Sequence, residues 1–358
     1  MQHLQALGAP HLDSFNELID HGLANVAKYM PPCSFKTPAG EKIDLYLEDI
    51  RIAKPQVPLT VLDVKERYIY PTEARQLHKS YTGMCSIKLG WRVDGIEKGA
   101  IDVDLGEVPI MLKSKVCNLG NKTPAEMIKH GEHDSEWGGI FIIKGNEKII
   151  RMLLMSRRNF PIAIKRNSWK DRGANFSELG ILIRSVREDE TSYNNVLHYL
   201  NNGTCKLMFS NMKFMAYVPV CLIIRCLVDY TDEEIYKRLV SGYEEDQYYL
   251  SCVQQMLRDV HAEGLHTYGQ CKDYLGQIFR SRFYELPEWY TNTQVTDYIL
   301  QQRILIHLET NKEKFDLLVF MVQKLFQCVQ GTAKIENVDS VMMQEVLTSG
   351  PFLFYTKK

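Results

Sequence analysis

The sequence predicts an α+β protein with two domains, and three observations support this prediction. At 358 residues the chain is longer than the ~100 to 200 residues of a typical compact domain. Short β-prone runs, separated by Pro, Gly and Asn, fill the chain up to Phe209. Helical periodicity is almost unbroken from Val220 onward. We expect a mixed or antiparallel sheet domain with packed helices, and a second domain with a small sheet and a helical bundle.

The first domain begins with an amphipathic helix expected over residues 12–30. Apolar side chains recur there at helical spacing, and Pro31 and Pro32 follow the last of them. Alternating apolar runs then predict antiparallel strands, of which the last ends in an Asp94-Gly95 turn. These runs are residues 43–47, 67–70 and 80–93.

A further strand running into a loop is expected over residues 102–119. Thr123 then supplies a cap, Pro124 the first helical position and Glu126 a negative charge near the positive end of the dipole, which predicts a short helix. Residues 138–164 follow as a hairpin that turns at Lys144-Gly145-Asn146, because glycine and asparagine accept positive φ at low cost.

The second domain is expected from about residue 167. Strand-like runs come first, joined by an Asn201-Asn202-Gly203 hairpin turn, and helices follow. The strands are residues 181–183, 195–199 and 204–209, and the helices are residues 220–228, 232–241, 246–262, 267–280, 292–303 and 312–330.

Composition limits the classes of function. The 43 basic and 44 acidic side chains nearly cancel, which excludes nucleic-acid binding by bulk charge and leaves only a local patch. The nine cysteines are odd in number, scattered and never spaced as CxxC, so we expect free thiols in a reducing, intracellular setting. No apolar run reaches the ~20 residues that span a bilayer, so no membrane partner is expected.

Neither a catalytic motif nor a strong metal signal is present. His130 and His133 beside Glu132 could suggest a metal site, but a solvated polar loop explains them better. Asp102 and Asp104 share one face of a strand, and a lone pair of aspartates is a weak magnesium signal. We therefore expect no catalytic and no metal-binding residues.

The one charge anomaly lies between Lys144 and Arg172, where nine basic residues face only Glu147 and Asp171. With Phe160 and Trp169 interleaved, such a segment could follow a phosphate backbone. The alternative is that about half of these side chains pair with acids elsewhere in the chain. The residues we place near nucleic acid are Arg157, Arg158, Lys165, Arg166, Lys170 and Arg172.

Several motifs resemble the N-terminal region of the second-largest subunit of multisubunit RNA polymerases. VPIMLKSKVCNL (108–119) and the GGIFIIKGNEK core within 138–164 resemble the whole family. The continuation to Ile164, with VREDE, LHYLNNGT and the late QEVLT, resembles the RNA polymerase I version specifically.

This resemblance implies a protrusion domain and a lobe domain that form the outer wall of the DNA cleft, with the lobe inserted into the protrusion. It places the protrusion at residues 1–166, the lobe at 167–346 and the start of the returning protrusion at 347–358. It also implies a nuclear, nucleolar protein that supports transcription of ribosomal RNA precursor. The implied partners are template DNA and other polymerase subunits, namely the largest subunit, a TFIIF-like heterodimer and a small zinc-ribbon subunit.

By the same resemblance, the catalytic Mg²⁺ belongs to the largest subunit and a Zn²⁺ site to a C-terminal part outside this sequence. This chain should then hold no cofactor and should not polymerise nucleotides alone. Two other hypotheses stay open: a freestanding nucleic-acid-processing enzyme without recognisable motifs, and a protein-interaction adaptor with no direct nucleic-acid contact.

Overall fold

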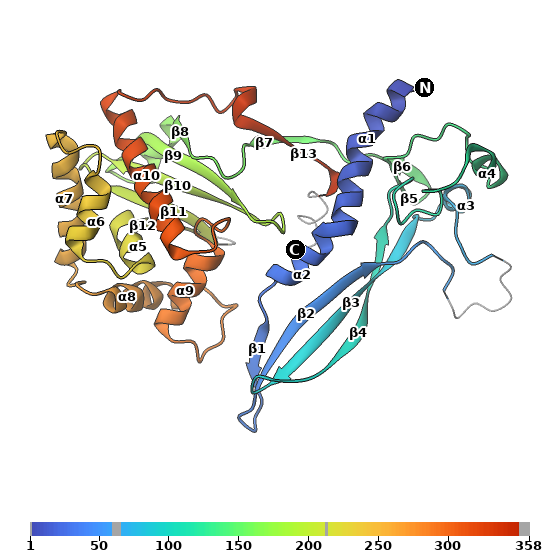
Figure 1. Ribbon diagram of the computed structural model, residues 1–358, viewed down its shortest axis with the longest axis horizontal. Helices are drawn as coiled ribbons and strands as arrows, with labels where there is room; N and C mark the ends of the chain where they lie inside the picture. Colours follow the sequence, from blue (N-terminus) through green and yellow to red (C-terminus); the bar gives the residue numbers. More distant parts are fainter. Residues whose placement is uncertain (1, 59–65, 212–213, 351–358) are drawn as a thin grey trace. The chain divides into compact units, whose positions relative to one another are not determined.

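The computed structural model describes residues 2–58, 66–211 and 214–350, and it divides into two compact units (Figure 1). Unit 1 consists of residues 1–154, 188–190 and 346–358, and unit 2 of residues 155–187 and 191–345. Because the chain leaves unit 1, builds almost all of unit 2 and then returns, unit 2 is an insertion. Helices and antiparallel sheets occur in both units, which confirms the predicted α+β class.

Unit 1 opens with the predicted N-terminal helix and a four-stranded antiparallel sheet. A π-helical turn over Leu18–Gly22 divides the helix in two, and the helix starts upstream of the predicted residue 12. Helix α2 packs against β2. The sheet order is β1-β2-β3-β4. The elements are α1 (Gln2–Glu17), α2 (Leu23–Tyr29), β1 (Cys33–Lys36), β2 (Lys42–Ile52), β3 (Thr82–Val93) and β4 (Ile96–Pro109).

The predicted strand over residues 67–70 is wrong. Only an isolated bridge from Tyr68 to Gln56 forms there. Two backbone hydrogen bonds flank this bridge, from the Val57 amide to the Arg67 carbonyl at 2.8 Å and from the Ile69 amide to the Pro55 carbonyl at 3.2 Å. The side-chain amide of buried Asn118 also donates to the carbonyl oxygens of Pro55 and Ile69, both at 2.8 Å, and so fixes the two segments together.

The short elements that complete unit 1 begin and turn where local chemistry predicts. Thr123 and Glu126 form a capping box at the start of α4. The central hairpin turns at Lys144 and Gly145, which have φ values of +51° and +76°. Its second strand ends before Ile149, earlier than predicted. The elements are α3 (Pro71–Gln76), α4 (Pro124–Lys129), β5 (Phe141–Ile143) and β6 (Asn146–Lys148).

Unit 2 contains a five-stranded antiparallel sheet in the order β12-β11-β10-β9-β8. Its three middle strands were predicted, whereas both edge strands were not. Because β8 pairs with β9, residues 155–166 belong to unit 2, and the boundary lies after Leu154 instead of after residue 166. The strands are β8 (Ile162–Lys165), β9 (Phe176–Val186), β10 (Ser192–Leu200), β11 (Cys205–Asn211) and β12 (Phe214–Pro219), with a short 3-10 helix over Asn167–Arg172.

Six helices follow the sheet, close to their predicted bounds, and α5 and α10 pack directly against its strands (Figure 1). The core between the layers includes Phe209, Ile223 and Leu325, which are completely buried. The helices are α5 (Val220–Leu227), α6 (Asp232–Val240), α7 (Gln247–Ala262), α8 (Tyr268–Arg280), α9 (Asn292–Gln302) and α10 (Asn311–Gln330).

The chain leaves unit 1 through β7 (Leu153–Ser156) and re-enters it through β13 (Gln344–Leu347), and these two strands pair with each other. A 3-10 turn over Val341–Met343 directly precedes β13. Beyond β13 the chain is fixed on α1. The hydroxyl of Ser349 donates to the carbonyl of His11 at 3.0 Å, and the Gly350 amide donates to the Ser14 hydroxyl at 2.9 Å.

Candidate nucleic-acid interface

The basic segment predicted as a single patch is divided between the two units. Lys144, Lys148 and Arg151 belong to unit 1, whereas the six residues that we placed near nucleic acid all belong to unit 2. Within unit 2 these six residues form two groups, one before β8 and one that starts at its last residue, Lys165. Six residues lie between Arg158 and Lys165, so the two are at most ~25 Å apart along the chain. The two groups therefore flank an edge strand instead of forming one compact site.

The first group contains a buried ion-pair cluster. Arg158 donates to the Glu345 carboxylate through its Nε at 3.1 Å and through its backbone amide at 3.1 Å. Arg184, whose side chain is 3% exposed, pairs with the same carboxylate at 2.5 Å. Burial raises the pKa of Glu345, but the hydrogen bonds from Arg184 and Arg158 outweigh it and hold that pKa below its usual value. Arg158 thus has a structural partner.

Arg157 has a different environment from Arg158. Its side chain is exposed, and its guanidinium lies 5.0 Å from the centre of the Phe160 ring. In the described ranges no carboxylate lies within ion-pair distance of it, so its charge is directed to solvent.

The second group shares one acid between two lysines. Lys165 and Lys170 contact Glu178 at 2.6 Å and 2.8 Å, with half or more of each lysine side chain exposed. Hydrogen bonds from these two lysines hold the pKa of Glu178 below its usual value. Arg166 is exposed, with no acidic partner among the residues that the structure describes. The group therefore keeps a surplus of positive charge.

Arg172 is held by aromatic rings and a histidine. Its Nη1 lies 2.6 Å from Nε2 of His198, and its guanidinium lies 5.5 Å from the Trp169 ring and 5.7 Å from the Tyr217 ring. His198 is completely buried, and burial, followed by the nearby Arg172 charge, lowers its pKa to about 3. His198 is therefore neutral at physiological pH, and Nε2 accepts the hydrogen bond from Arg172.

Sequence reasoning identified the basic residues but missed the partners of half of them. Lys165, Lys170 and Arg158 are paired, as the alternative interpretation of this segment expected. Arg184 carried a usable signal, because an arginine inside the apolar run from Ile181 to Val186 indicates a buried ion pair.

One buried histidine and one partly buried histidine predict that unit 2 loses stability in acid. Burial lowers the pKa of His198 to about 3, and burial and then Lys314 lower that of His307 to about 4. The unfolded chain, with ordinary histidine pKa values near 6.5, binds these protons first as the pH falls. The stabilisation is therefore complete above pH 6.5 and is lost between pH 6.5 and 4, at about 1.4 kcal/mol per pH unit for each histidine.

His307→Asn isolates one of these contributions. Between pH 6.5 and 4.5, the difference in free energy of unfolding between the original chain and the variant should shrink by about 1.4 kcal/mol per pH unit. Urea titrations at several pH values measure this difference. The contribution of titrating carboxylates cancels from it, because both proteins contain the same carboxylates. Parallel pH profiles would contradict the assignment.

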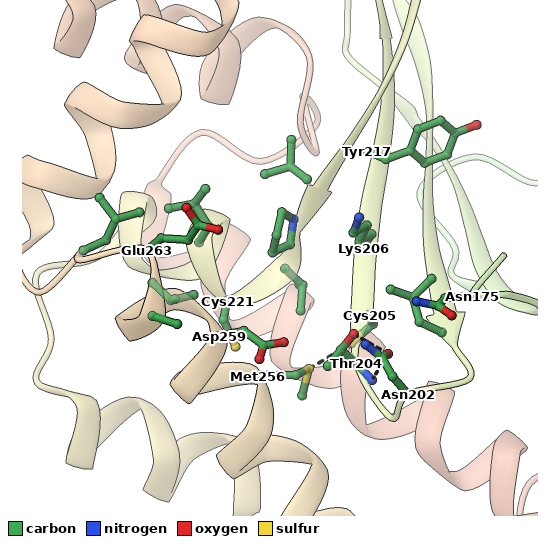
Figure 2. A pocket seen from close by; sticks show the side chains of 18 of the residues that line it. Asn175, Asn202, Thr204, Cys205, Lys206, Tyr217, Cys221, Met256, Asp259 and Glu263 are labelled. Carbon is green, nitrogen blue, oxygen red and sulfur yellow. Dashed lines mark hydrogen bonds between the residues drawn. The ribbon is translucent and has the colours of Figure 1, made fainter. Parts of the chain in front are cut away.

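Unit 2 also contains an open pocket of about 610 Å³ (Figure 2). Its lining includes Gly173, the residue that directly follows the basic segment. Asp259 reaches it from α7 and Glu263 from the position directly after that helix, whereas Lys206 and Tyr217 come from strands β11 and β12 (Figure 2). Apolar side chains make up most of its remaining wall. Tyr217 connects the pocket to the basic segment, because its ring also contacts Arg172. An apolar pocket with a few charged groups at its edge suits an anchoring side chain of a protein partner.

The weak metal signal corresponds to structural contacts. Glu132 is buried and bonds to Arg75 at 2.7 Å, while His130 stacks on Tyr70 with ring centres 3.8 Å apart. Within residues 2–58, 66–211 and 214–350 we find no group of three or more His, Cys, Asp or Glu residues arranged to hold a metal. In the same ranges, every helix is too short or too polar to cross a membrane.

The sequence motifs agree with a comparison to known proteins. Residues 6–350 match the RNA polymerase beta subunit family, and the chain belongs to that family. Similar proteins include the DNA-directed RNA polymerase I subunit RPA2 of Drosophila melanogaster, 64% identical over 349 residues, and that of Homo sapiens, 42% identical over 356 residues. The RNA polymerase I subunit RPA135 of Saccharomyces cerevisiae is 37% identical over 374 residues.

These alignments cover 98%, 99% and 98% of the chain and 31% of each relative. The chain thus spans about a third of the length of the curated relatives it matches. The predicted resemblance to the second-largest subunit of RNA polymerase I is confirmed.

Proposed function

We propose that this chain is the DNA-flanking part of an RNA polymerase I second-largest subunit, with unit 1 as the protrusion and unit 2 as the lobe. In this proposal the chain forms part of the wall of the DNA cleft and docks other polymerase subunits. It acts in the nucleolus of the nucleus, where ribosomal RNA precursor is made. High identity to proteins named RNA polymerase I subunits supports the assignment. Insertion of unit 2 into unit 1 supports the two domain names.

The observation that supports DNA contact is the surplus positive charge at the two ends of β8. Arg157 and Arg166 are exposed, and Lys165 and Lys170 share the single carboxylate of Glu178. Cations that lack acidic partners can neutralise phosphates and release counterions, which makes binding depend on salt. Arg158 and Arg172 contribute less in this proposal, because Glu345 and the His198 cluster already hold them.

The test is duplex DNA binding by an Arg157→Ala/Arg166→Ala double variant. If both arginines contact phosphates, the slope of log affinity against log salt should fall by up to about 2, since each contact contributes about 0.9. Fluorescence anisotropy over a salt series measures this slope. A matched control is Arg238→Ala/Arg258→Ala, which removes two exposed arginines from helices α6 and α7. Equal slopes for the two double variants would contradict the proposed DNA contact.

The partner subunits follow from the same proposal. The largest subunit, the TFIIF-like heterodimer and the small zinc-ribbon subunit are the proposed protein partners. The catalytic Mg²⁺ would come from the largest subunit, and the Zn²⁺ site from a part of the subunit outside this sequence. The 358-residue chain alone should therefore show no nucleotidyl transfer, and a metal-dependent polymerase or nuclease assay on it tests this expectation.

A second candidate function is protein docking without direct DNA contact. The pocket lined by Lys206, Tyr217, Asp259 and Glu263 favours it, because it offers an apolar anchor site with a charged edge. This adaptor function predicts capture of polymerase I subunits by the chain with no measurable DNA affinity at low salt.

A further inference from the structure

Two histidines in unit 2 face each other where one helix ends and the next begins. His261 lies in the last turn of α7, and His266 directly precedes Thr267, the N-cap of α8. Their Nδ1 atoms are 2.9 Å apart, and their ring centres are 5.0 Å apart. We name these two side chains the histidine pair. Two ring nitrogens of a type that binds metals therefore lie side by side.

Asp232 determines the tautomer of the first histidine. Its Oδ2 lies 2.6 Å from Nε2 of His261. An ionised carboxylate only accepts hydrogen bonds, so Nε2 of His261 carries a proton and donates. In a neutral His261 ring the lone pair is then on Nδ1, and it accepts from the Nδ1–H of His266. A carboxylate behind an imidazole is the arrangement that orients histidines that bind metals.

A buried arginine fixes both halves of the histidine pair. Arg225 is 6% exposed, and its Nη2 donates to Oδ1 of Asp232, the carboxylate behind His261. Its Nη1 donates to the carbonyl of Leu265 at 2.9 Å, and Leu265 is the buried residue before His266. The histidine pair is therefore held in place before any ligand binds, which reduces the entropy that binding costs.

The spacing of the two nitrogens suits a transition metal. Zinc binds histidine nitrogen at about 2.0 to 2.1 Å. Two such ligands that make an angle of about 90° to 109° at the metal lie about 2.9 to 3.4 Å apart. The observed 2.9 Å lies at the lower end of this range. The same distance fits a hydrogen bond between the two rings, which is the alternative that the experiments below distinguish.

We propose that the histidine pair binds a divalent transition-metal ion of the Zn²⁺ class, with both Nδ1 atoms as ligands. Imidazole nitrogen suits Zn²⁺, Cu²⁺ and Ni²⁺, whereas Mg²⁺ and Ca²⁺ prefer oxygen. When the ion binds, the proton on Nδ1 of His266 moves through solvent to Nε2 of the same ring, so no proton is released overall. This site is separate from the Zn²⁺ site proposed for the part of the subunit outside this sequence.

The surrounding charges favour a cation, and the number of ligands makes the site exchangeable. His261 lies at the negative end of the α7 dipole, which outweighs the opposing effect of the capped start of α8 because Asp232 adds a carboxylate on the same side. In the described ranges no group of three or more His, Cys, Asp or Glu residues is arranged to hold a metal, so water occupies the remaining positions of the ion.

Metal binding at the histidine pair also acts on the pocket of unit 2. The loop between the two histidines contributes Glu263 and Leu265 to the pocket wall. An ion held from both sides of this loop links the end of α7 to the start of α8 and restricts the motion of that wall. The inference depends neither on DNA contact nor on protein docking, so the failure of either would leave it standing.

The Zn²⁺ affinity of the 358-residue chain tests the proposal. A Cys33→Ser background removes the exposed cysteine, and the other eight cysteines are buried, so thiols do not compete. Competition with a chromogenic chelator should show one bound Zn²⁺ per chain. His266→Ala should lower this affinity about tenfold or more, since even the loss of an outer-shell partner costs at least that much. The exposed position of His266 means that this variant keeps the fold.

The matched control is His21→Ala/His133→Ala, which removes two exposed histidines from unit 1 and should leave the Zn²⁺ affinity unchanged. Absence of Zn²⁺ binding, equal affinities of the original chain and His266→Ala, or an equal loss in the control would each overturn the proposal. The histidine pair would then be a hydrogen bond only.

Cu²⁺ supplies a readout that a purely structural histidine would not change. With one equivalent of Cu²⁺, electron paramagnetic resonance should show hyperfine coupling to two ring nitrogens in the original chain and to one in His266→Ala. Hydrogen exchange of a peptide over residues 262–267 should slow when Zn²⁺ is added to the original chain and should not change in the variant. Identical Cu²⁺ spectra for the two proteins, or loop exchange that ignores Zn²⁺, would contradict binding by the histidine pair.

Discussion

Replacing Glu345 by glutamine is expected to lower the free energy of unfolding of unit 2 by about 3 to 5 kcal/mol. Glu345 is the carboxylate that both Arg158 and the deeply buried Arg184 contact. Removing its charge leaves a guanidinium that is 3% exposed without a compensating anion. Two nitrogens of Arg184, Nε and Nη2, have no protein partner even in the intact cluster, so the site has no spare acceptor to replace Glu345.

The measurement is hydrogen exchange of β9 and β10 peptides along a urea series, which follows unit 2 separately from unit 1. Glu178→Gln is the matched control. It removes another carboxylate of unit 2 that accepts from two cations, but both of these cations, Lys165 and Lys170, are exposed. The control should change stability little, since exposed ion pairs contribute little. Similar losses for the two variants would show that burial of Arg184 does not determine the effect.

Helices were predictable because the signals that begin them are local in the sequence. Thr231, Thr267, Thr291 and Thr310 each form a capping box with a Glu or Gln three residues later. The hairpin at Gly145 was equally visible, because its turn residues adopt positive φ. Edge strands β8 and β12 were missed, since a short apolar run has no periodicity that separates strand from loop.

For the candidate site, the sequence could predict which residues are basic, but not which of them have acidic partners in the fold. Whether a cation faces solvent depends on acids that are remote in the sequence, and 187 residues separate Arg158 from Glu345. Arg172 illustrates the same limit, because His198 and Tyr217 reach it from two different strands of the folded sheet. The sequence run therefore identified the region, and only the fold separates Arg157 and Arg166 from their paired neighbours.

The second large effect is expected for Asn195→Ala, which should lower the free energy of unfolding of unit 2 by about 2 to 6 kcal/mol. Asn195 is completely buried in β10. Its Nδ2 donates to the carbonyl of Arg303 at 2.9 Å, and its Oδ1 accepts from the amide of Leu305 at 3.0 Å. The variant unpairs two buried backbone groups, each at a cost of about 1 to 3 kcal/mol.

The backbone that Asn195 holds is itself unfavourable, which is why a side chain from the sheet is needed. Leu305 has a φ of +44°, in the left-handed region that residues with a Cβ avoid. Asn195→Asp should also lose stability, because its carboxylate still accepts from Leu305 but buries a charge and places an oxygen that cannot donate against the Arg303 carbonyl. Asn194→Ala removes the adjacent, exposed asparagine and should stay within about 0.5 kcal/mol of the original chain. If Asn194→Ala and Asn195→Ala were equally destabilising in urea titrations, the amide bridge from β10 could not be what fixes this turn.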